Sequence, residues 1–483
     1  MTSCPFLGAL FSVPSSPCAS DIQGTLTVAH ASPGITNRLC DSAARAGESG
    51  GVGAAGSAGL VLASIRRDSA IQVLCTVLGM GCSFALYSLM GHFLGPSPLG
   101  VWAATSAACS MVFAFGSLGV DAIACREMAK APEDSGRIFG SALAMRLTVT
   151  FPLVIILTVV LIGSLRLPRT FWQFAVTYVA YAGLATLSGL IGKAFQARQR
   201  FGLQLVPILF YGLLSILVIF PMLAKGRGIT SVVTATAAGQ FLGVVVGLSL
   251  LRRLVEIRPR WIWSEWKWLL RESYPLAISM PFLAAYVRID SVMLAAMKGT
   301  ASVGLYNSGY TILMACGGLM AAVQSAIFPS LSRLYAESRE AAHYVFLRGL
   351  RWMALAGTFV FGLSLVAPRM ILRLLFGPKF LQAVFSFQVL MLAALFLFLN
   401  NTCGIALTAV GQQRWAPRIT IAGLGLNVIL NLLLIPRLDY LGSSYATLAT
   451  EIFVLVFAYL ALRPHWRRVT TPVLKLTRAA DPE

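Results

Sequence analysis

Long apolar runs dominate this chain, and they set its fold class. Stretches of about 20 mainly apolar residues are long enough to cross the hydrocarbon core of a bilayer as α-helices. Twelve such stretches occur, at residues 70–95, 98–121, 141–164, 171–195, 203–223, 229–251, 273–297, 302–328, 349–375, 382–409, 415–436 and 440–462. Continuous runs favour helices over the short alternating strands of a membrane β-barrel. The pattern predicts an all-α polytopic membrane protein with 12 transmembrane helices.

The two halves of the chain repeat each other at an offset of about 204 residues. The connection after the first span reads GPSPLGVW from Gly95, and the connection after the seventh reads GTASVGLY from Gly299. Two glycines and an aromatic residue therefore recur at equal spacing. The segment Gln199–Phe201 before the fifth span likewise matches Gln413–Trp415 before the eleventh. Matches that keep the same order in both halves indicate an internal duplication.

Six spans in each half bring the second half into the membrane in the same orientation as the first. Carriers built from such parallel repeats hold their site between the halves, which rock to open to each side in turn. The predicted architecture is two parallel-orientation six-helix lobes around a central cavity. The expected segments are a disordered N-terminal tail (1–65), an N-lobe with helices 1–6 (66–251), a cytoplasmic interfacial linker (252–272), a C-lobe with helices 7–12 (273–463) and a cytoplasmic C-terminal tail (464–483).

Composition and charge agree with a membrane location. Only 12% of the residues are charged and 57% are hydrophobic, whereas soluble domains carry about one quarter charged residues. The net charge is +20, and 26 of the basic residues in the loops and chain ends lie on the face that carries both termini, against nine on the opposite face. Because cytoplasmic loops are enriched in Lys and Arg, we expect both termini to be cytoplasmic. This bias accounts for the basic surplus without a nucleic-acid partner.

The segment that joins the two halves has a composition of its own. Residues 258–268 interleave Arg and Lys with four tryptophans. In a soluble protein this pattern would fit stacking on single-stranded nucleic acid. Beside a membrane it is typical of an amphipathic segment at the level of the lipid headgroups, which is the interpretation adopted for the linker.

Catalytic and metal-binding motifs are missing from the sequence. There is no H-E-x-x-H, G-x-S-x-G or Walker pattern, only four histidines are present, and the nine cysteines form no C-x-x-C pair. The predicted outer loops are too short to form a folded catalytic domain. We therefore expect a transporter and not an enzyme, with no catalytic residue, no metal and no cofactor.

Polar side chains inside the predicted spans mark the candidate transport site, because each is costly in hydrocarbon unless it faces protein, water or substrate. The candidates for lining the cavity are Arg146, Arg288, Asn307, Gln324, Asn400, Asn401, Asn427 and Asn431, and the candidates for ion coupling are Asp290 and Glu451. Asn427 and Asn431 are four apart and share a helix face. Arg288 and Asp290 are two apart and lie on different faces. The alternatives are interhelical hydrogen bonds for the amides and acids and snorkelling to the surface for Arg146.

Several stretches resemble the bacterial polysaccharide biosynthesis flippases of the multidrug, oligosaccharidyl-lipid and polysaccharide exporter superfamily. They are Tyr274-Pro275, Asp290, Gly299, Val303–Asn307, Pro329, the LFGPKF loop Leu375–Phe380, Asn427, Asn431, Pro436, Gly442, Tyr445–Thr447 and Glu451. The resemblance extends over about residues 66–463. His92 departs from it, because relatives often carry Arg or Lys before the first outer loop.

The resemblance implies a carrier that moves an undecaprenyl-diphosphate-linked oligosaccharide across the bacterial inner membrane by alternating access. Such a flippase supplies the synthesis of O-antigen or exopolysaccharide at the cell surface. The implied partners are this lipid-linked oligosaccharide, the membrane lipids, and a polysaccharide polymerase with its chain-length regulator. Arg288 would suit the diphosphate, because the forked donors of a guanidinium match phosphate oxygens.

Three other functions compete with this interpretation. A multidrug or cation antiporter of the same superfamily would be favoured by an acidic cavity. A peptidoglycan-precursor flippase is close in kind, although the form usual there has two more helices than the 12 predicted. An integral-membrane polysaccharide polymerase or ligase is expected to carry a long external loop with catalytic Arg or His, and the sequence contains no such loop.

Overall fold

The computed structural model describes residues 53–152, 155–156, 172–325 and 327–466, and within these ranges the chain is helical, with no β-strand. The helices of the first half are α3 (Gly53–Leu94), α4 (Pro96–Ser117), α5 (Val120–Lys130), α6 (Ser135–Met145), the π-helical segment η1 (Arg146–Thr150), α8 (Trp172–Ala197), α9 (Phe201–Ala224) and α10 (Ile229–Leu251). Those of the second half are α11 (Trp263–Lys298), α12 (Thr300–Ser325), α13 (Phe328–Glu337), α14 (Arg339–Val366), α15 (Pro368–Phe376), the 3-10 helix η3 (Pro378–Ala383), α16 (Val384–Ala409), α17 (Trp415–Leu438) and α18 (Tyr440–Trp466).

Ten helical segments in the described ranges are long and apolar enough to cross a membrane. They correspond to ten of the 12 predicted spans. The third predicted span, 141–164, runs into residues outside the described ranges. The eighth is α12, whose 26 residues include several Gly, Ser and Thr together with Asn307. This helix tolerates them because it packs between α3, α4 and α16. The all-α polytopic fold is confirmed, and the count of 12 stays a prediction.

Two boundaries differ from those expected. α3 begins at Gly53, inside the segment 1–65 for which a disordered tail was expected; residues 1–52 lie outside the described ranges. A helix already nucleated by a span gains one hydrogen bond for each added residue, and the Ala and Leu residues of this stretch favour that extension. The linker 252–272 is helical from Trp263, where α11 begins and continues without interruption into the seventh span.

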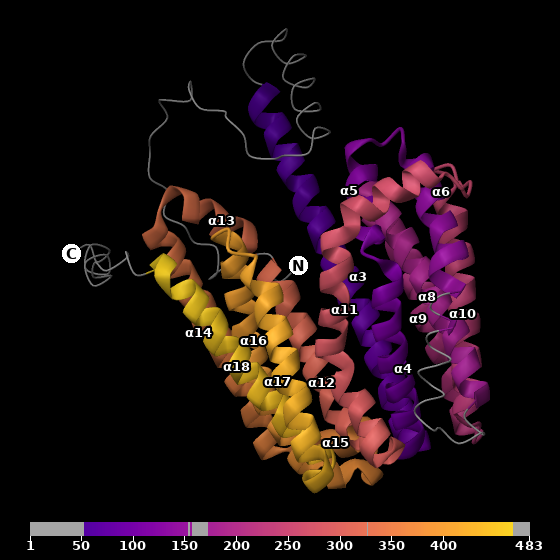
Figure 1. The fold of residues 1–483 in the computed structure, drawn as a ribbon, viewed down its shortest axis with the longest axis vertical. Helices are drawn as coiled ribbons and strands as arrows, with labels where there is room; N and C mark the ends of the chain where they lie inside the picture. The colour runs from indigo at the N-terminus through magenta and orange to yellow at the C-terminus, as the bar shows by residue number, and fades with distance from the viewer. Residues whose placement is uncertain (1–52, 153–154, 157–171, 326, 467–483) are drawn as a thin grey trace. The chain divides into compact units, whose positions relative to one another are not determined.

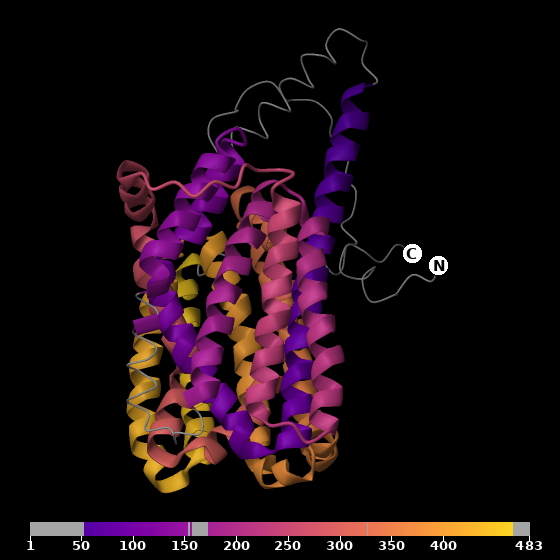
Figure 2. The same ribbon diagram turned by 90° about the vertical axis from the view of Figure 1, so that its right-hand side faces the viewer.

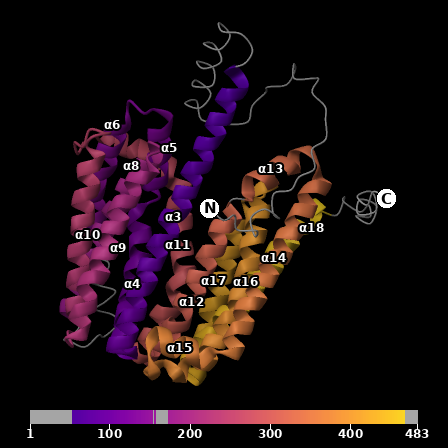
Figure 3. The ribbon, with the colours of Figure 1, turned by 180° about the vertical axis from the view of Figure 1, so that it is seen from behind.

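The long helices contact one another both within each half of the chain and between the halves, where α4 packs against α11 and α12. In the first half α10 contacts α8 and α9, and in the second half α18 contacts α16 and α17. Figure 1 shows the helices of the two halves, and Figure 3 shows them from behind. The long helices run side by side along the long direction of Figure 2. α5, α6 and α13 lie at one end of the long helices and α15 lies at the other (Figures 1 and 3).

The repeated glycines of the sequence mark the place where the two halves touch most closely. Gly95 and Gly299 precede α4 and α12 in the same unusual backbone conformation, with φ values of 86° and 90°. A positive φ of this size suits glycine because other residues carry a Cβ that clashes. The equal conformation at equivalent positions supports the duplication inferred from sequence.

The second glycine of each repeat lets α4 and α12 cross backbone to backbone. A Cβ added at Gly100 would lie 1.7 Å from the backbone oxygen of Thr300, and a Cβ added at Gly304 would lie 1.9 Å from that of Pro96. The Oγ atoms of Ser97 and Thr300 lie 3.1 Å apart across the same contact. The contact is therefore reciprocal between the halves.

Replacing Gly304 with Ala is expected to force this contact apart, because the added methyl group meets backbone atoms that cannot rotate away. The measurement is the yield of a disulfide between Ser97→Cys and Thr300→Cys in the full chain, determined by mass spectrometry of the linked peptide. The yield should fall to a small fraction of that in the parent. The control is Gly425→Ala, where an added Cβ meets nothing within 4 Å. An unchanged yield in Gly304→Ala would contradict the close crossing.

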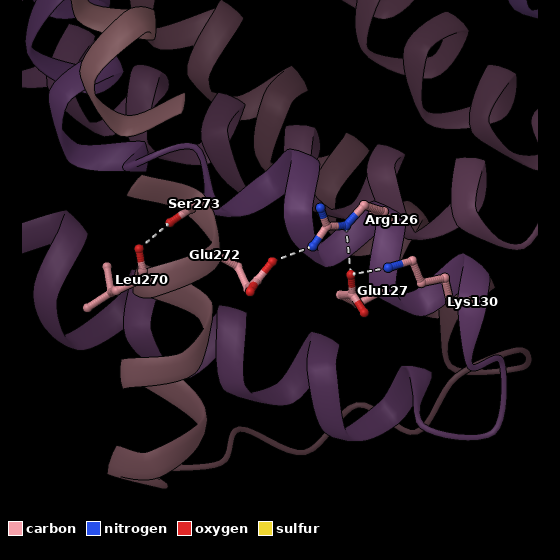
Figure 4. Close-up of polar contacts among 6 residues, drawn as sticks. All are labelled: Arg126, Glu127, Lys130, Leu270, Glu272 and Ser273. Atoms are coloured by element: carbon pink, nitrogen blue, oxygen red, sulfur yellow. Dashed lines mark hydrogen bonds and ion pairs between the residues drawn. The ribbon is translucent and has the colours of Figure 1, made fainter. Parts of the chain in front are cut away.

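An ionic cluster joins α5 to the start of α11 (Figure 4). Arg126 donates from Nη2 to Oε2 of Glu272 and from Nε to Oε1 of Glu127, at 2.7 Å in each case, and Lys130 Nζ lies 3.0 Å from the same Glu127 oxygen. Burial alone would raise the pKa of Glu127, but the hydrogen bonds from Lys130 and Arg126 hold it below its ordinary value. These contacts connect the linker helix to the N-lobe at an exposed surface.

Candidate functional site

The first buried polar cluster of the C-lobe surrounds Asp290 on α11. Its carboxylate accepts hydrogen bonds from Asn431 Nδ2 at 2.6 Å, from the hydroxyl of Tyr306 at 3.1 Å and from Thr447 Oγ1 at 3.4 Å. Only 3% of the residue is exposed. No Lys or Arg forms an ion pair with Asp290 within the described ranges. A buried carboxylate is therefore held by neutral donors from α12, α17 and α18.

A second layer of polar side chains orients these donors. The Nδ2 atom of Asn431 also lies 3.0 Å from Oδ1 of Asn427, and its own Oδ1 accepts a hydrogen bond from Ser443 at 2.9 Å. Asn307 Nδ2 donates to Ser291 Oγ on α11 at 3.0 Å. The shared face predicted for the two asparagines of α17 thus points into the C-lobe, where buried polar groups require such partners.

The second cluster surrounds Glu451 on α18. Its Oε2 accepts a hydrogen bond from Asn400 Nδ2 at 2.6 Å, and its Oε1 accepts one from the hydroxyl of Tyr286 at 2.9 Å. Gln324 Nε2 donates to the carbonyl oxygen of Phe398 at 3.2 Å. The Oδ1 of Asn400 and the Oε1 of Gln324 are buried without a hydrogen-bond partner in the described part of the chain.

A cavity of about 610 Å³ opens beside the second cluster. It is lined by Tyr286, Gln324, Phe328, Leu397, Asn400, Asn401, Gly404, Ile405, Leu407, Thr408, Ala416, Ile419, Thr420, Glu451, Val454 and Ala458. All of these residues belong to the C-lobe, and among these described lining residues Glu451 alone is charged. Four of the predicted site residues therefore line the same cavity. They are Gln324, Asn400, Asn401 and Glu451.

The two predicted site arginines lie elsewhere. Arg146, at the start of η1, is 4% exposed. It donates to the carbonyl oxygen of Thr186, and its Nη2 lies 2.5 Å from Oδ1 of Asp121, so that it pairs inside the N-lobe. Arg288 on α11 is half-buried, on a helix that contacts both α4 of the first half and α17 of the second. It is not among the residues that line the C-lobe cavity.

The N-lobe also holds a polar contact between two of its spans. On α10, Gln240 donates from Nε2 to Oγ of Ser188 on α8 at 2.6 Å. In the order of the predicted spans these two helices are the sixth and the fourth, and their counterparts in the second half, α18 and α16, carry Glu451 and Asn400. The N-lobe contact is between neutral side chains, whereas the C-lobe contact includes a carboxylate.

The hydroxyl partners of the two carboxylates are not among the residues predicted from sequence. A signal for them exists: Ser443, Thr447 and Glu451 are each four residues apart on α18, and Tyr286 lies four residues before Asp290 on α11. Residues four apart lie one above the other on a helix. Polar positions at this spacing within an apolar span would have indicated a polar face.

Comparisons with known proteins give a consistent set of relatives. A family model described as polysaccharide biosynthesis protein matches residues 65–335. An uncharacterized membrane protein of Methanocaldococcus jannaschii is 25% identical over 426 residues, which cover 83% of this chain and 99% of that protein. A putative O-antigen transporter of Escherichia coli (strain K12) is 25% identical over 38% of this chain and 45% of its own length. The capsular polysaccharide biosynthesis protein CapF of Staphylococcus aureus is 27% identical over 38% of this chain and 47% of its own length.

Solved structures share the fold. The lipid II flippase MurJ in an inward closed conformation gives a TM-score of 0.67 at 14% identity and covers 86% of this chain and 93% of its own. An inward-facing multidrug resistance transporter of the MATE family gives a TM-score of 0.62 at 13% identity and covers 86% of this chain and 100% of its own. At these identities the likeness concerns the arrangement of helices.

Proposed function

Since the family model covers more than half of the chain, the protein belongs to the polysaccharide biosynthesis protein family, and we propose that it is a flippase for a polyprenyl-diphosphate-linked oligosaccharide. The resemblance inferred from sequence is confirmed at the level of the family. Membrane transporters of the same superfamily share its fold. The lipid-linked substrate and its transfer from the inner to the outer leaflet are the proposal.

The observation that carries the proposal is the pair of buried polar clusters in the C-lobe, one of them beside a cavity of about 610 Å³. A sugar diphosphate cannot cross hydrocarbon unaided, because its charges and hydroxyl groups would lose water without replacement. Amide and carboxylate groups inside a helical bundle replace that water, and the polyprenyl tail stays in lipid. Arg288, on a helix that contacts both halves, is the proposed contact for the diphosphate.

We assign ion coupling to the cluster around Asp290. A carboxylate that is buried without a cation is costly in its charged form, so that a proton or a metal cation bound there would stabilise it. Oxygen atoms of Asn427, Ser443 and Thr447 lie in the same cluster. Binding and release of such an ion would favour, in turn, the inward-open and the outward-open arrangement of the lobes. An ion gradient could in this way drive movement of the lipid-linked substrate.

The proposed setting is the bacterial inner membrane, with both termini in the cytoplasm. The polymerase and the chain-length regulator that act on the exported oligosaccharide are the proposed protein partners. A cation or drug antiporter is the second candidate function, because Glu451 puts an acidic group in the wall of the C-lobe cavity and no basic residue is among its described lining residues.

A leaflet-resolved assay tests the proposal. The full chain is reconstituted in vesicles with a labelled undecaprenyl-diphosphate-linked oligosaccharide, and an impermeant enzyme that modifies the sugar reports which leaflet holds it. We expect the protein to move the lipid without covalent change, at a rate well above that of protein-free vesicles. Chain extension would favour the polymerase, and export of an organic cation with no movement of the lipid would favour the antiporter.

A further inference from the structure

The two buried carboxylates of the C-lobe lie in different surroundings. Asp290 is enclosed by Asn431, Tyr306 and Thr447 and is not part of the cavity wall. Glu451 is 6% exposed and forms part of the wall of the C-lobe cavity. A group in a closed cluster binds something as small as an ion, whereas a group beside a large cavity meets a larger ligand. The two acids therefore have separate tasks.

We propose that the C-lobe cavity is the sugar subsite of the transporter, where Glu451, Asn400 and Gln324 accept hydrogen bonds from sugar hydroxyl groups. This assignment rests on the proposed flippase function and deepens it. Asp290 and Glu451 are both predicted from sequence as candidates for ion coupling. The present assignment leaves Asp290 as the one candidate of the two.

Unused acceptor atoms at the cavity wall are the first argument. The Oε1 of Gln324 and the Oδ1 of Asn400 are buried without a partner in the part of the chain that the structure describes. Buried polar atoms nearly always have partners, and exceptions call for an explanation. Each carboxylate oxygen of Glu451 receives one protein donor, although a carboxylate has room for about four. Gln324 and Asn400 both line the cavity, so a ligand that brings hydrogen-bond donors would supply the partners that these two buried oxygens lack once the side chains turn toward it.

The size and the remaining lining of the cavity are the second argument. Its volume of about 610 Å³ falls within the range of roughly 300–1,000 Å³ that is usual for ligand sites. Apolar side chains, among them Leu397, Ile405 and Val454, form much of the wall, together with the ring of Phe328. Sugar rings present C–H faces beside their hydroxyl groups, so that they match a wall that alternates apolar surface with a few acceptors.

The small number of oxygen ligands at the cavity wall is the argument against a cation there. The Tyr286 hydroxyl and the Asn400 amide group direct their hydrogen atoms at the two carboxylate oxygens. A small cation needs several oxygen atoms that converge on one point at about 2.3–2.6 Å, as in calcium sites. The cavity is many times larger than an ion, and Glu451 is the one charged residue among its described lining residues, so the wall suits neutral hydroxyl groups instead.

Filling the cavity tests the subsite. Gly404 lines the cavity, and an added Cβ there meets nothing within 4 Å, so that Gly404→Leu adds volume without a clash in the helix. The matched control is Gly425→Leu on α17, an exposed position with the same free space. Glu451→Gln removes the charge and keeps the shape. Size-exclusion profiles check that each full-length variant remains folded.

The readout is the affinity of the purified protein for two probes, measured by native mass spectrometry: an undecaprenyl-diphosphate-linked oligosaccharide and undecaprenyl diphosphate without sugar. We expect the parent and Gly425→Leu to prefer the sugar-bearing lipid by about tenfold or more, because a site built to hydrogen-bond a hydroxyl discriminates against ligands that lack it. Gly404→Leu and Glu451→Gln should bind both probes with the affinity that the parent has for the sugar-free lipid.

Two results would overturn the assignment. Full preference for the sugar-bearing lipid in Gly404→Leu would place the sugar elsewhere. Retained preference in Glu451→Gln together with loss of stimulation of transport by an ion gradient would make Glu451 an ion site. Failure of the proposed function itself looks different, because the parent protein would then bind neither lipid.

Discussion

Asp290→Asn is expected to abolish the stimulation of lipid transport by an ion gradient. The substitution keeps the shape of the side chain and removes the charge that a proton or cation would neutralise. Coupling between two sites is typically worth 1–3 kcal/mol, so we expect the gradient-driven rate to fall by roughly 5- to 150-fold. The rate without a gradient should change less, because Asp290 is not part of the cavity wall.

The measurement compares initial rates of leaflet transfer in vesicles with an imposed sodium or pH gradient and without one. Asp134→Asn is the matched control, since it makes the same chemical change at a residue whose side chain is 46% exposed. Equal gradient stimulation in Asp290→Asn and in the parent protein would remove Asp290 from the coupling mechanism. Loss of transport under both conditions would assign it a role in binding or folding instead.

Arg146→Met is expected to destabilise the N-lobe more than any surface substitution. The Arg146 side chain is 5% exposed, and it lies 2.5 Å from the carboxylate of Asp121. Removing one partner of a fully buried ion pair costs about 3–5 kcal/mol, and the loss here should be smaller because the Asp121 side chain left unpaired is 26% exposed. The apparent unfolding temperature of the detergent-solubilised protein should therefore fall clearly below that of the parent.

A second substitution separates the structural role of Arg146 from contact with substrate. Replacing both ends of a buried pair with neutral side chains is often close to neutral for stability, so Arg146→Met combined with Asp121→Asn should recover much of the lost stability. If the pair is structural, the double variant also transports. A stable double variant that no longer binds the lipid diphosphate would show instead that Arg146 contacts the anion.

The ionic cluster of α5 and α11 and the glycine crossing of α4 and α12 connect the same two halves at different places. Arg126 and Glu272 join the N-lobe to the linker helix, whereas Gly100 and Gly304 let the backbones of the two halves meet. Surface ion pairs contribute little and exchange readily, but a backbone crossing tolerates no added atom. If the lobes rock, the contact between the backbones at Gly100 and Gly304 therefore either stays intact or separates completely.

Part of the site was within reach of the sequence. An Asn, Gln, Asp or Glu inside an apolar run is recognisable because hydrocarbon penalises it wherever it faces lipid. Gln324, Asn400 and Glu451 were selected on that ground and meet at one cavity. Which of them would meet was not predictable, since they come from α12, α16 and α18 and their contact depends on how distant helices pack.

Arg146 and Arg288 illustrate the limit of the same reasoning. Both are cations in or beside predicted spans, and both are predicted from sequence to line the cavity. The structure pairs Arg146 with Asp121 inside the N-lobe and leaves Arg288 half-buried on a helix that contacts both halves. The partner of Arg146 stands 25 residues earlier in the chain, on a helix whose rotation no local pattern specifies.

The sequence by itself was enough to predict the membrane class, the apolar spans and the duplication. These features depend on the length of apolar runs and on repeated spacing, which are local properties of the chain. Only the tertiary structure decided that Asp290 lies in a closed cluster and Glu451 beside a cavity. Both acids look alike in sequence, as single charges within apolar helices. Their difference comes from the packing of α11, α12, α16, α17 and α18, which places donors around one carboxylate and open space beside the other.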